Sequence, residues 1–124
     1  MATLLIVDDD RASRLRLAQL ARSLGYHAIM ASDGARALIM LEDNPDILCV
    51  ITDWQMPCLD GPGLIRSLRA SENAVPILVY SAYRSIGEVA GLLELGANGF
   101  LPYPVPAEAL AEYMERFVFN GRES

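Results

Sequence analysis

Short apolar runs alternate along the chain with longer segments in which apolar residues recur at helical spacing. The clearest run covers residues 47–51 and leads almost directly into the acid Asp53. A continuous apolar run with β-branched members is typical of a strand that is buried on both faces of a parallel sheet. The turn residues Pro57, Asp60 and Gly61 follow at once. The pattern therefore predicts that Asp53 lies at the carboxyl end of a buried strand.

The rest of the chain repeats this order of strand and helix. The other apolar runs, which we predict to be strands, cover residues 3–7, 26–31, 77–80 and 100–101. Helical spacing predicts helices at residues 12–24, from the caps Ser32 and Asp33 to Leu41, and at residues 61–71, 85–95 and 107–119. Gly87 and Gly91 each weaken the fourth helix by about 1 kcal/mol relative to alanine, so we expect it to be short or mobile. Pro102 confines the last strand to a sheet edge.

Five strand-then-helix units without a linker or repeat predict a single α/β domain over residues 1–124, with no output domain. Strict alternation indicates a parallel sheet with right-handed crossovers and helices on both faces. Because five units are too few for an eight-stranded barrel, we expect a doubly wound three-layer sandwich.

Composition and charge narrow the function. The net charge of −6 disfavours direct binding to nucleic acid. All ten basic residues are arginines, so the chain contains no lysine, and those of the first helix are expected to face mostly solvent. Cys49 and Cys58 lack metal-ligand spacing and are expected to be reduced thiols. Neither a signal peptide nor a membrane span is predicted, and we expect a cytoplasmic protein without a membrane partner.

Polar residues follow several of the predicted strands at what should be one edge of the sheet, where open α/β folds bind ligands. They are Asp8–Asp10 after the first strand, Asp53 after the third, Ser81 after the fourth and Tyr103 after the fifth. Carboxylates grouped in this way suit Mg²⁺, and a carboxylate beside the metal can act as a nucleophile toward phosphorus. The alternative is that these acids only cap helices and turns, which explains one acid per helix rather than three in a row.

Four stretches in this order resemble the receiver domain of two-component response regulators, the CheY-like family. They are Leu5–Asp10, Asp53–Pro57 with Asp60–Gly61, Val79–Ala82 and Gly96–Phe100. The resemblance covers essentially the whole chain. It implies the flavodoxin-like (βα)5 fold with strand order 2-1-3-4-5, and a signalling function rather than an enzymatic one.

The resemblance also implies roles for individual residues. Asp53 would accept a phosphoryl group from a histidine kinase phosphohistidine. Asp9, Asp53 and the backbone carbonyl of Gln55 would hold Mg²⁺, with Asp8 supporting the ion through water. Ser81 would donate its hydroxyl to the phosphoryl group.

Phe100 would be the aromatic switch residue of the family. The fourth helix, the fifth strand and the fifth helix would form the face that contacts other proteins, although core packing also explains most apolar residues there. The implied partners are a sensor histidine kinase or phosphotransfer protein and a downstream protein or output domain. The expected state is a monomer or weak dimer.

One departure from the family is serious, because Tyr103 stands before Pro104 where the family has a lysine. An ammonium group about 4 Å from a carboxylate is worth on the order of 4 kcal/mol at an effective dielectric constant of 20. A neutral tyrosine hydroxyl contributes nearer to about 1 kcal/mol. We therefore expect stronger dependence on Mg²⁺ and weaker phosphorylation or switching, with Arg84 as the nearest candidate cation.

Two other functions fit parts of the sequence. A receiver fold retained only as a binding or adaptor module, never phosphorylated, is consistent with the missing lysine. A haloacid-dehalogenase-type phosphatase is suggested by Asp8 and Asp10 after an apolar strand, but that family needs a lysine. His27, the only histidine, is expected to serve surface or packing roles. Trp54 and Tyr83 are expected to be lid or packing residues.

Overall fold

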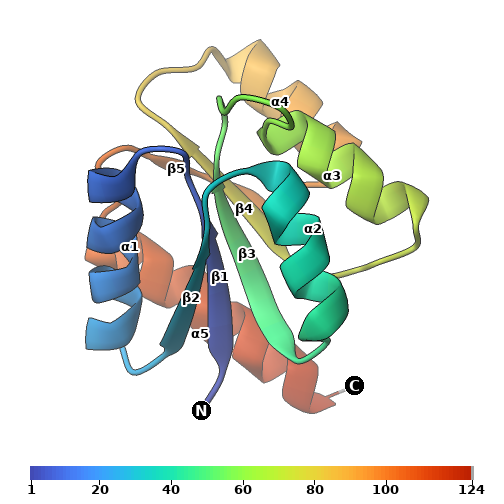
Figure 1. The fold of residues 1–124 in the computed structure, drawn as a ribbon. Helices are drawn as coiled ribbons and strands as arrows, with labels where there is room; N and C mark the ends of the chain where they lie inside the picture. Colours follow the sequence, from blue (N-terminus) through green and yellow to red (C-terminus); the bar gives the residue numbers. More distant parts are fainter. Residues whose placement is uncertain (124) are drawn as a thin grey trace.

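The central element is a five-stranded parallel sheet with the order β2-β1-β3-β4-β5 (Figure 1). The computed structural model describes residues 1–123, with side chains described to residue 118. The strands are β1 (Thr3–Val7), β2 (His27–Ala31), β3 (Ile47–Asp53), β4 (Ile77–Ser81) and β5 (Gly99–Pro102). The parallel pairing confirms the prediction from the alternating pattern, and the edge position of β5 confirms the prediction from Pro102. The strand order is the one that the family resemblance implied.

Helices cover both faces of this sheet, as the alternating pattern predicted (Figure 1). They are α1 (Arg11–Ser23), α2 (Gly34–Asp43), α3 (Gly61–Ala70), α4 (Ile86–Leu95) and α5 (Ala107–Glu123). Helix α5 continues four residues beyond its predicted end at Phe119. Among the residues that the structure describes, none of the helices has the length and apolar character needed to cross a membrane.

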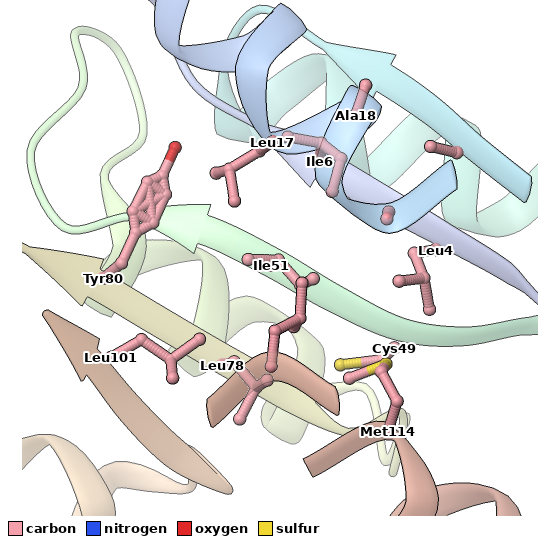
Figure 2. Packing of buried hydrophobic residues seen from close by; sticks show 13 residues of the cluster. Leu4, Ile6, Leu17, Ala18, Cys49, Ile51, Leu78, Tyr80, Leu101 and Met114 are labelled. Carbon is pink, nitrogen blue, oxygen red and sulfur yellow. The ribbon is translucent and has the colours of Figure 1, made fainter. Parts of the chain in front are cut away.

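The sheet separates two apolar clusters, because alternate side chains of a strand point to opposite faces. Leu4 and Ile6 of β1 pack with residues of α1 and α5, whereas Leu5 and Val7 pack with residues of α2, α3 and α4. Figure 2 shows the first cluster, with the ring of Tyr80 at one end of it. The apolar runs in the sequence are therefore continuous because both faces of each central strand are buried.

Local capping sets where the helices begin. The side chain of Asp10 accepts the backbone N–H of Ser13 at 2.9 Å at the start of α1. At the start of α4, Ser85 and Glu88 form a reciprocal capping box. Helix α4 has ten residues, as do α2 and α3. Helix α4 is thus as long as α2 and α3, because the cap and the burial of Leu92 offset the two glycines, and its mobility stays a prediction.

Strand β5 packs closely against α5 at the sheet edge. A Cβ atom at Gly99 would lie 2.5 Å from the ring of Tyr113, so only glycine fits here without displacing that side chain. Leu110 and Met114 of α5 are fully buried in the first apolar cluster. This packing fixes β5 beside β4 and places Tyr103, which follows the strand, at the carboxyl edge of the sheet.

Candidate functional site

Three carboxylates meet at the carboxyl edge of the sheet. Asp8 and Asp9 follow β1, and Asp53 is the last residue of β3. The two strands are neighbours, with Val7 paired to Thr52, so their ends deliver these acids to one place. Carboxylate oxygens of Asp8, Asp9 and Asp53 all lie within 4.8 Å of one another. Such proximity is electrostatically unfavourable unless a cation or hydrogen-bond donors compensate it.

Asp8 is the most deeply buried member of the cluster, with 2% of its surface exposed. One carboxylate oxygen accepts the backbone N–H of Asp10 at 2.8 Å, and the other accepts a short hydrogen bond from the hydroxyl of Tyr80. Burial raises the pKa of Asp8 above its usual value, and these two hydrogen bonds act against that change. Tyr80 therefore supports the site, although the apolar run predicted only a strand position for it.

Asp53 is half-buried beside Asp8. Burial, followed by the negative charge of Asp8, raises the pKa of Asp53 from 3.8 to about 6. Hydrogen bonds from the backbone N–H groups of Gln55 and Trp54 act in the opposite direction. The carboxylate is thus mostly ionised at neutral pH, but its charge is poorly compensated by the groups around it.

The donor set fits a small, hard divalent cation. Mg²⁺ takes oxygen ligands at about 2.0–2.1 Å, which places neighbouring ligand oxygens about 3–4 Å apart. The carboxylate oxygens of the three acids already lie within 4.8 Å. Gln55 lies beside both Asp53 and Asp9 at the mouth of this site. These residues can therefore supply two or three oxygen ligands and leave the remaining positions to water.

A cavity of about 280 Å³ opens beside Asp53. Ser81, the last residue of β4, and Tyr103, after β5, line it together with Asp8, Asp53 and Gln55. The structure thus brings side chains from the ends of four strands to one cavity. Its lining is about equally polar and apolar and it is partly open to solvent, so a small anionic group can reach Asp53.

The side chain of Tyr103 is held toward α1. Its hydroxyl shares a 2.8 Å hydrogen bond with Ser13 and accepts one from Arg16 at 3.1 Å, and its ring stacks on Tyr80 at 5.8 Å. Arg14 donates to the backbone carbonyl of Asp8 at 2.7 Å. Arg16 is nevertheless exposed, as expected, whereas Arg14 is only partly exposed because its side chain reaches back to the backbone of Asp8.

Aromatic residues lie on the other side of Asp53. The rings of Trp54 and Phe100 meet edge to face at 6.0 Å, and the guanidinium carbon of Arg84 lies 4.3 Å from the centre of the Trp54 ring. Trp54 is therefore a packing residue, as expected. Tyr83 is 85% exposed, so it does not have the packing role that was one of its two expected roles, and a lid role stays a prediction. His27 is exposed at the first residue of β2, at the opposite end of its strand from the acids.

Comparison with known proteins agrees with this arrangement. The family model described as response regulator receiver domain matches residues 4–115. The response regulator MprA of Mycobacterium avium is 41% identical over 112 residues, which is 90% of this chain and 48% of the relative. The chain therefore spans about half the length of the relatives of this kind that it matches.

Solved structures give the same result. A response regulator receiver protein from Pseudomonas putida is 33% identical with a TM-score of 0.85, covering 93% of this chain and 96% of that chain. The chemotaxis protein CheY4 of Vibrio cholerae is 27% identical with a TM-score of 0.85, covering 94% and 98%. Response regulator receiver domains are signalling proteins rather than classical enzymes. This chain belongs to the response regulator receiver domain family of two-component systems.

Proposed function

We propose that this receiver domain accepts a phosphoryl group on Asp53 from a phosphohistidine of a sensor histidine kinase or phosphotransfer protein. The observation that carries the proposal is the meeting of Asp8, Asp9 and Asp53 within 4.8 Å, beside a cavity that Ser81 also lines. Capping a helix does not require three acids from two strands in one place. A divalent cation at a phosphoryl-transfer site, in contrast, needs several oxygen ligands close together.

The transfer itself needs little from the protein beyond a nucleophile and charge compensation. A carboxylate oxygen of Asp53 attacks phosphorus, forming a P–O bond while the P–N bond breaks. The bonding electrons go to the imidazole nitrogen, and the ring leaves as neutral imidazole when its other nitrogen already carries a proton. With a pKa of about 6, Asp53 is mostly in the ionised form that this step requires at neutral pH.

Asp9, Asp53 and the backbone carbonyl of Gln55 are the proposed ligands of Mg²⁺, and Asp8 supports the ion through water. When bound, Mg²⁺ offsets the negative charge shared by the carboxylates and the phosphoryl oxygens. Tyr103 cannot supply a positive charge, and its hydroxyl is already bonded to Ser13 and Arg16. The site therefore depends more on the metal than a site that contains a lysine would.

The proposal also assigns the residues that pass the signal to other proteins. Ser81 donates its hydroxyl to a phosphoryl oxygen, and Phe100 responds as the switch residue. Helix α4 carries exposed apolar side chains, with Ile86 91% and Leu93 44% exposed, whereas Leu92 is buried. We assign the face formed by α4, β5 and α5 to contacts with a downstream protein or with an output domain. The greater length of the relatives is consistent with such a domain.

A second function is favoured by one observation, the hydrogen bonds that hold the hydroxyl of Tyr103 to Ser13 and Arg16. Without a cation at that position, the fold can serve as a binding module that other proteins recognise regardless of phosphorylation. In that case the acids would bind Mg²⁺ or remain metal-free, and Asp53 would not react.

Phosphorylation by a small donor separates the two functions. The protein is incubated with phosphoramidate and Mg²⁺, and intact mass is recorded. Phosphotransfer predicts an added mass of about 80 Da that is lost in Asp53→Asn and when a chelator removes Mg²⁺. Asp46→Asn, at an exposed position, is the matched control and should still gain the mass. An unchanged mass for the unaltered protein would favour the binding module.

A further inference from the structure

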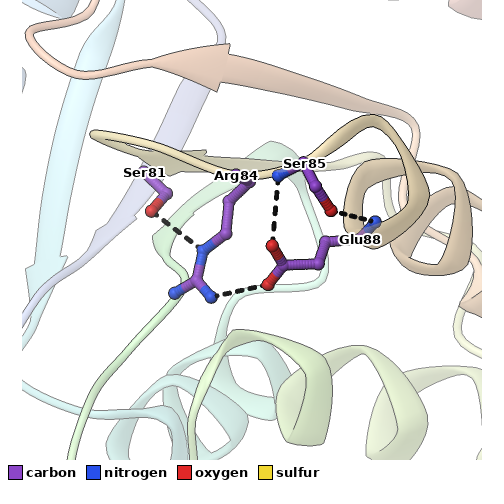
Figure 3. Close-up of polar contacts among 4 residues, drawn as sticks. All are labelled: Ser81, Arg84, Ser85 and Glu88. Carbon is purple, nitrogen blue, oxygen red and sulfur yellow. Dashed lines mark hydrogen bonds and ion pairs between the residues drawn. The ribbon is translucent and has the colours of Figure 1, made fainter.

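Arg84 is the arginine whose contacts include both a side chain of the cavity and the residue next to Asp53. Its Nε–H donates to the hydroxyl oxygen of Ser81 at 3.2 Å (Figure 3). Its guanidinium carbon lies 4.3 Å from the centre of the Trp54 ring. Only 17% of its side chain is exposed. A guanidinium group is thus held beside the cavity by a hydroxyl on one side and an aromatic ring on another.

The charge of Arg84 is only weakly neutralised. Its acidic partner is Glu88, whose carboxylate lies 3.1 Å from Nη1 and whose side chain is 46% exposed. The same carboxylate also accepts the backbone N–H of Ser85 in the capping box of α4 (Figure 3). Exposed ion pairs four residues apart contribute little, because water competes for both charges. Within the described part of the chain, Nη2 of Arg84 makes no hydrogen bond.

The cavity beside Asp53 has no cation of its own. Arginine is absent from its described lining, and the chain has no lysine. The nearby arginines of α1 are engaged elsewhere, Arg14 by the backbone carbonyl of Asp8 and Arg16 by the hydroxyl of Tyr103. A phosphoryl group on Asp53 would carry up to two negative charges and three acceptor oxygens, in place of the single charge of the free carboxylate.

We propose that Arg84 is the residue that binds the phosphoryl group on Asp53, supplying from the β4–α4 connection the positive charge that Tyr103 does not supply after β5. This rests on the proposed phosphorylation of Asp53. Nη2 has no hydrogen-bond partner among the described residues and Nη1 has only Glu88, so these two donors can meet two oxygens of a phosphoryl group while Nε stays on Ser81. Arg84 reaches the group together with Ser81, to which it is already bonded.

A movement of Arg84 toward the phosphoryl group would also change the contacts of α4. When Arg84 turns toward a phosphoryl oxygen, Nη1 leaves Glu88, which stands in the first turn of α4. The face of Trp54 loses its cation as well, and Trp54 contacts Phe100. One side chain thereby connects the reactive carboxylate with both the helix and the aromatic pair of the output face.

Beryllium fluoride, which adds to carboxylates as an inorganic phosphoryl mimic, is the probe for testing this. Its affinity for the full chain is measured by calorimetry in excess Mg²⁺, for the unaltered protein and for Arg84→Gln, Arg84→Lys and Glu88→Gln. We expect Arg84→Gln to weaken binding at least tenfold and Arg84→Lys to retain most of the affinity. Glu88→Gln should bind at least twofold more tightly, because it releases Arg84 from its ion pair.

The outcomes separate this inference from the proposed function. Equal affinities for the unaltered protein and a folded Arg84→Gln would overturn the role of Arg84 while leaving phosphorylation of Asp53 intact. If Arg84→Gln fails to fold, judged by its melting curve, an unchanged affinity in Glu88→Gln overturns it instead. If the unaltered protein takes neither beryllium fluoride nor a phosphoryl group from phosphoramidate, both the proposed function and this inference fail.

Discussion

Replacing Asp53 by asparagine should stabilise the metal-free protein at neutral pH. The carboxylate of Asp53 lies within 4.8 Å of those of Asp8 and Asp9, and its pKa is raised from 3.8 to about 6. A difference of that size corresponds to about 3 kcal/mol at full strength. Because Asp53 is only half-buried, solvent screening reduces the expected gain to about 1–2 kcal/mol. Asparagine keeps the acceptor for the backbone N–H groups of Gln55 and Trp54.

The direction of the pKa change determines how the stability gain of Asp53→Asn depends on pH. With a raised pKa, the folded protein holds the Asp53 proton more tightly than the unfolded chain does between pH 3.8 and about 6. The stability from that proton is complete below the unfolded pKa and is lost as the pH rises through the folded pKa. The asparagine of the variant carries no titrating proton. The stability advantage of Asp53→Asn should therefore be present at pH 7.5 and shrink toward pH 4.

Urea unfolding at pH 7.5 and pH 4.5, with a chelator present, measures both effects. Asp46→Asn, which removes an exposed acid at the opposite end of β3 from Asp53, is the control and should change stability by less than about 0.5 kcal/mol. Adding Mg²⁺ at about a hundred times its dissociation constant should stabilise the unaltered protein by about 2.7 kcal/mol and the variant much less. The order of stability of the two proteins should then reverse.

Two results would refute the reasoning. If metal-free Asp53→Asn is no more stable than the unaltered protein at pH 7.5, the three carboxylates do not repel one another appreciably. If the variant is more stable by the same amount at both pH values, the gain comes from packing or from the unfolded state rather than from the charge of Asp53.

Three further predictions concern the neighbours of the cluster. Tyr80→Phe removes a buried donor to Asp8 and should destabilise the protein by about 1–3 kcal/mol in urea unfolding, whereas Tyr83→Phe, at an exposed position, should be neutral. Tyr103→Lys places an ammonium group beside the acids and should move the pKa of Asp53 from about 6 toward 3.8 in a carboxyl NMR titration; an unchanged pKa would mean that position 103 does not act on Asp53. Ser85→Ala removes the cap of α4 and should cost about 1 kcal/mol, with faster hydrogen exchange confined to that helix.

The strands and the meeting of the acids follow from local pattern and topology. In β4, Ile77–Tyr80 are all buried, so the apolar run marks the strand directly. Once the sheet is parallel, Asp8 and Asp53 must emerge at the same edge, since their strands are neighbours. No knowledge of side-chain conformations is needed for either conclusion.

Contacts made by the tips of long side chains could not be predicted in the same way. Tyr80 belongs to an apolar run, and the partner of its hydroxyl, Asp8, is 72 residues away. The one signal available was a tyrosine close to the polar edge of a buried strand, because such a ring usually finds a partner for its hydroxyl. Helical spacing likewise cannot tell whether the guanidinium of Arg14 or Arg16 ends in water or on the next element. Glycine content alone could not predict the length of α4, because tertiary burial and capping override helix propensity.

The shortness of β5 restricts how another protein can associate with this edge of the sheet. With four residues and a terminal proline, this outer strand presents few main-chain groups that an incoming strand could pair with. A partner is therefore not expected to extend the sheet. It must contact side chains on the flanking helices instead. The choice of partner can therefore change through surface substitutions that leave the two apolar clusters and the acidic edge untouched.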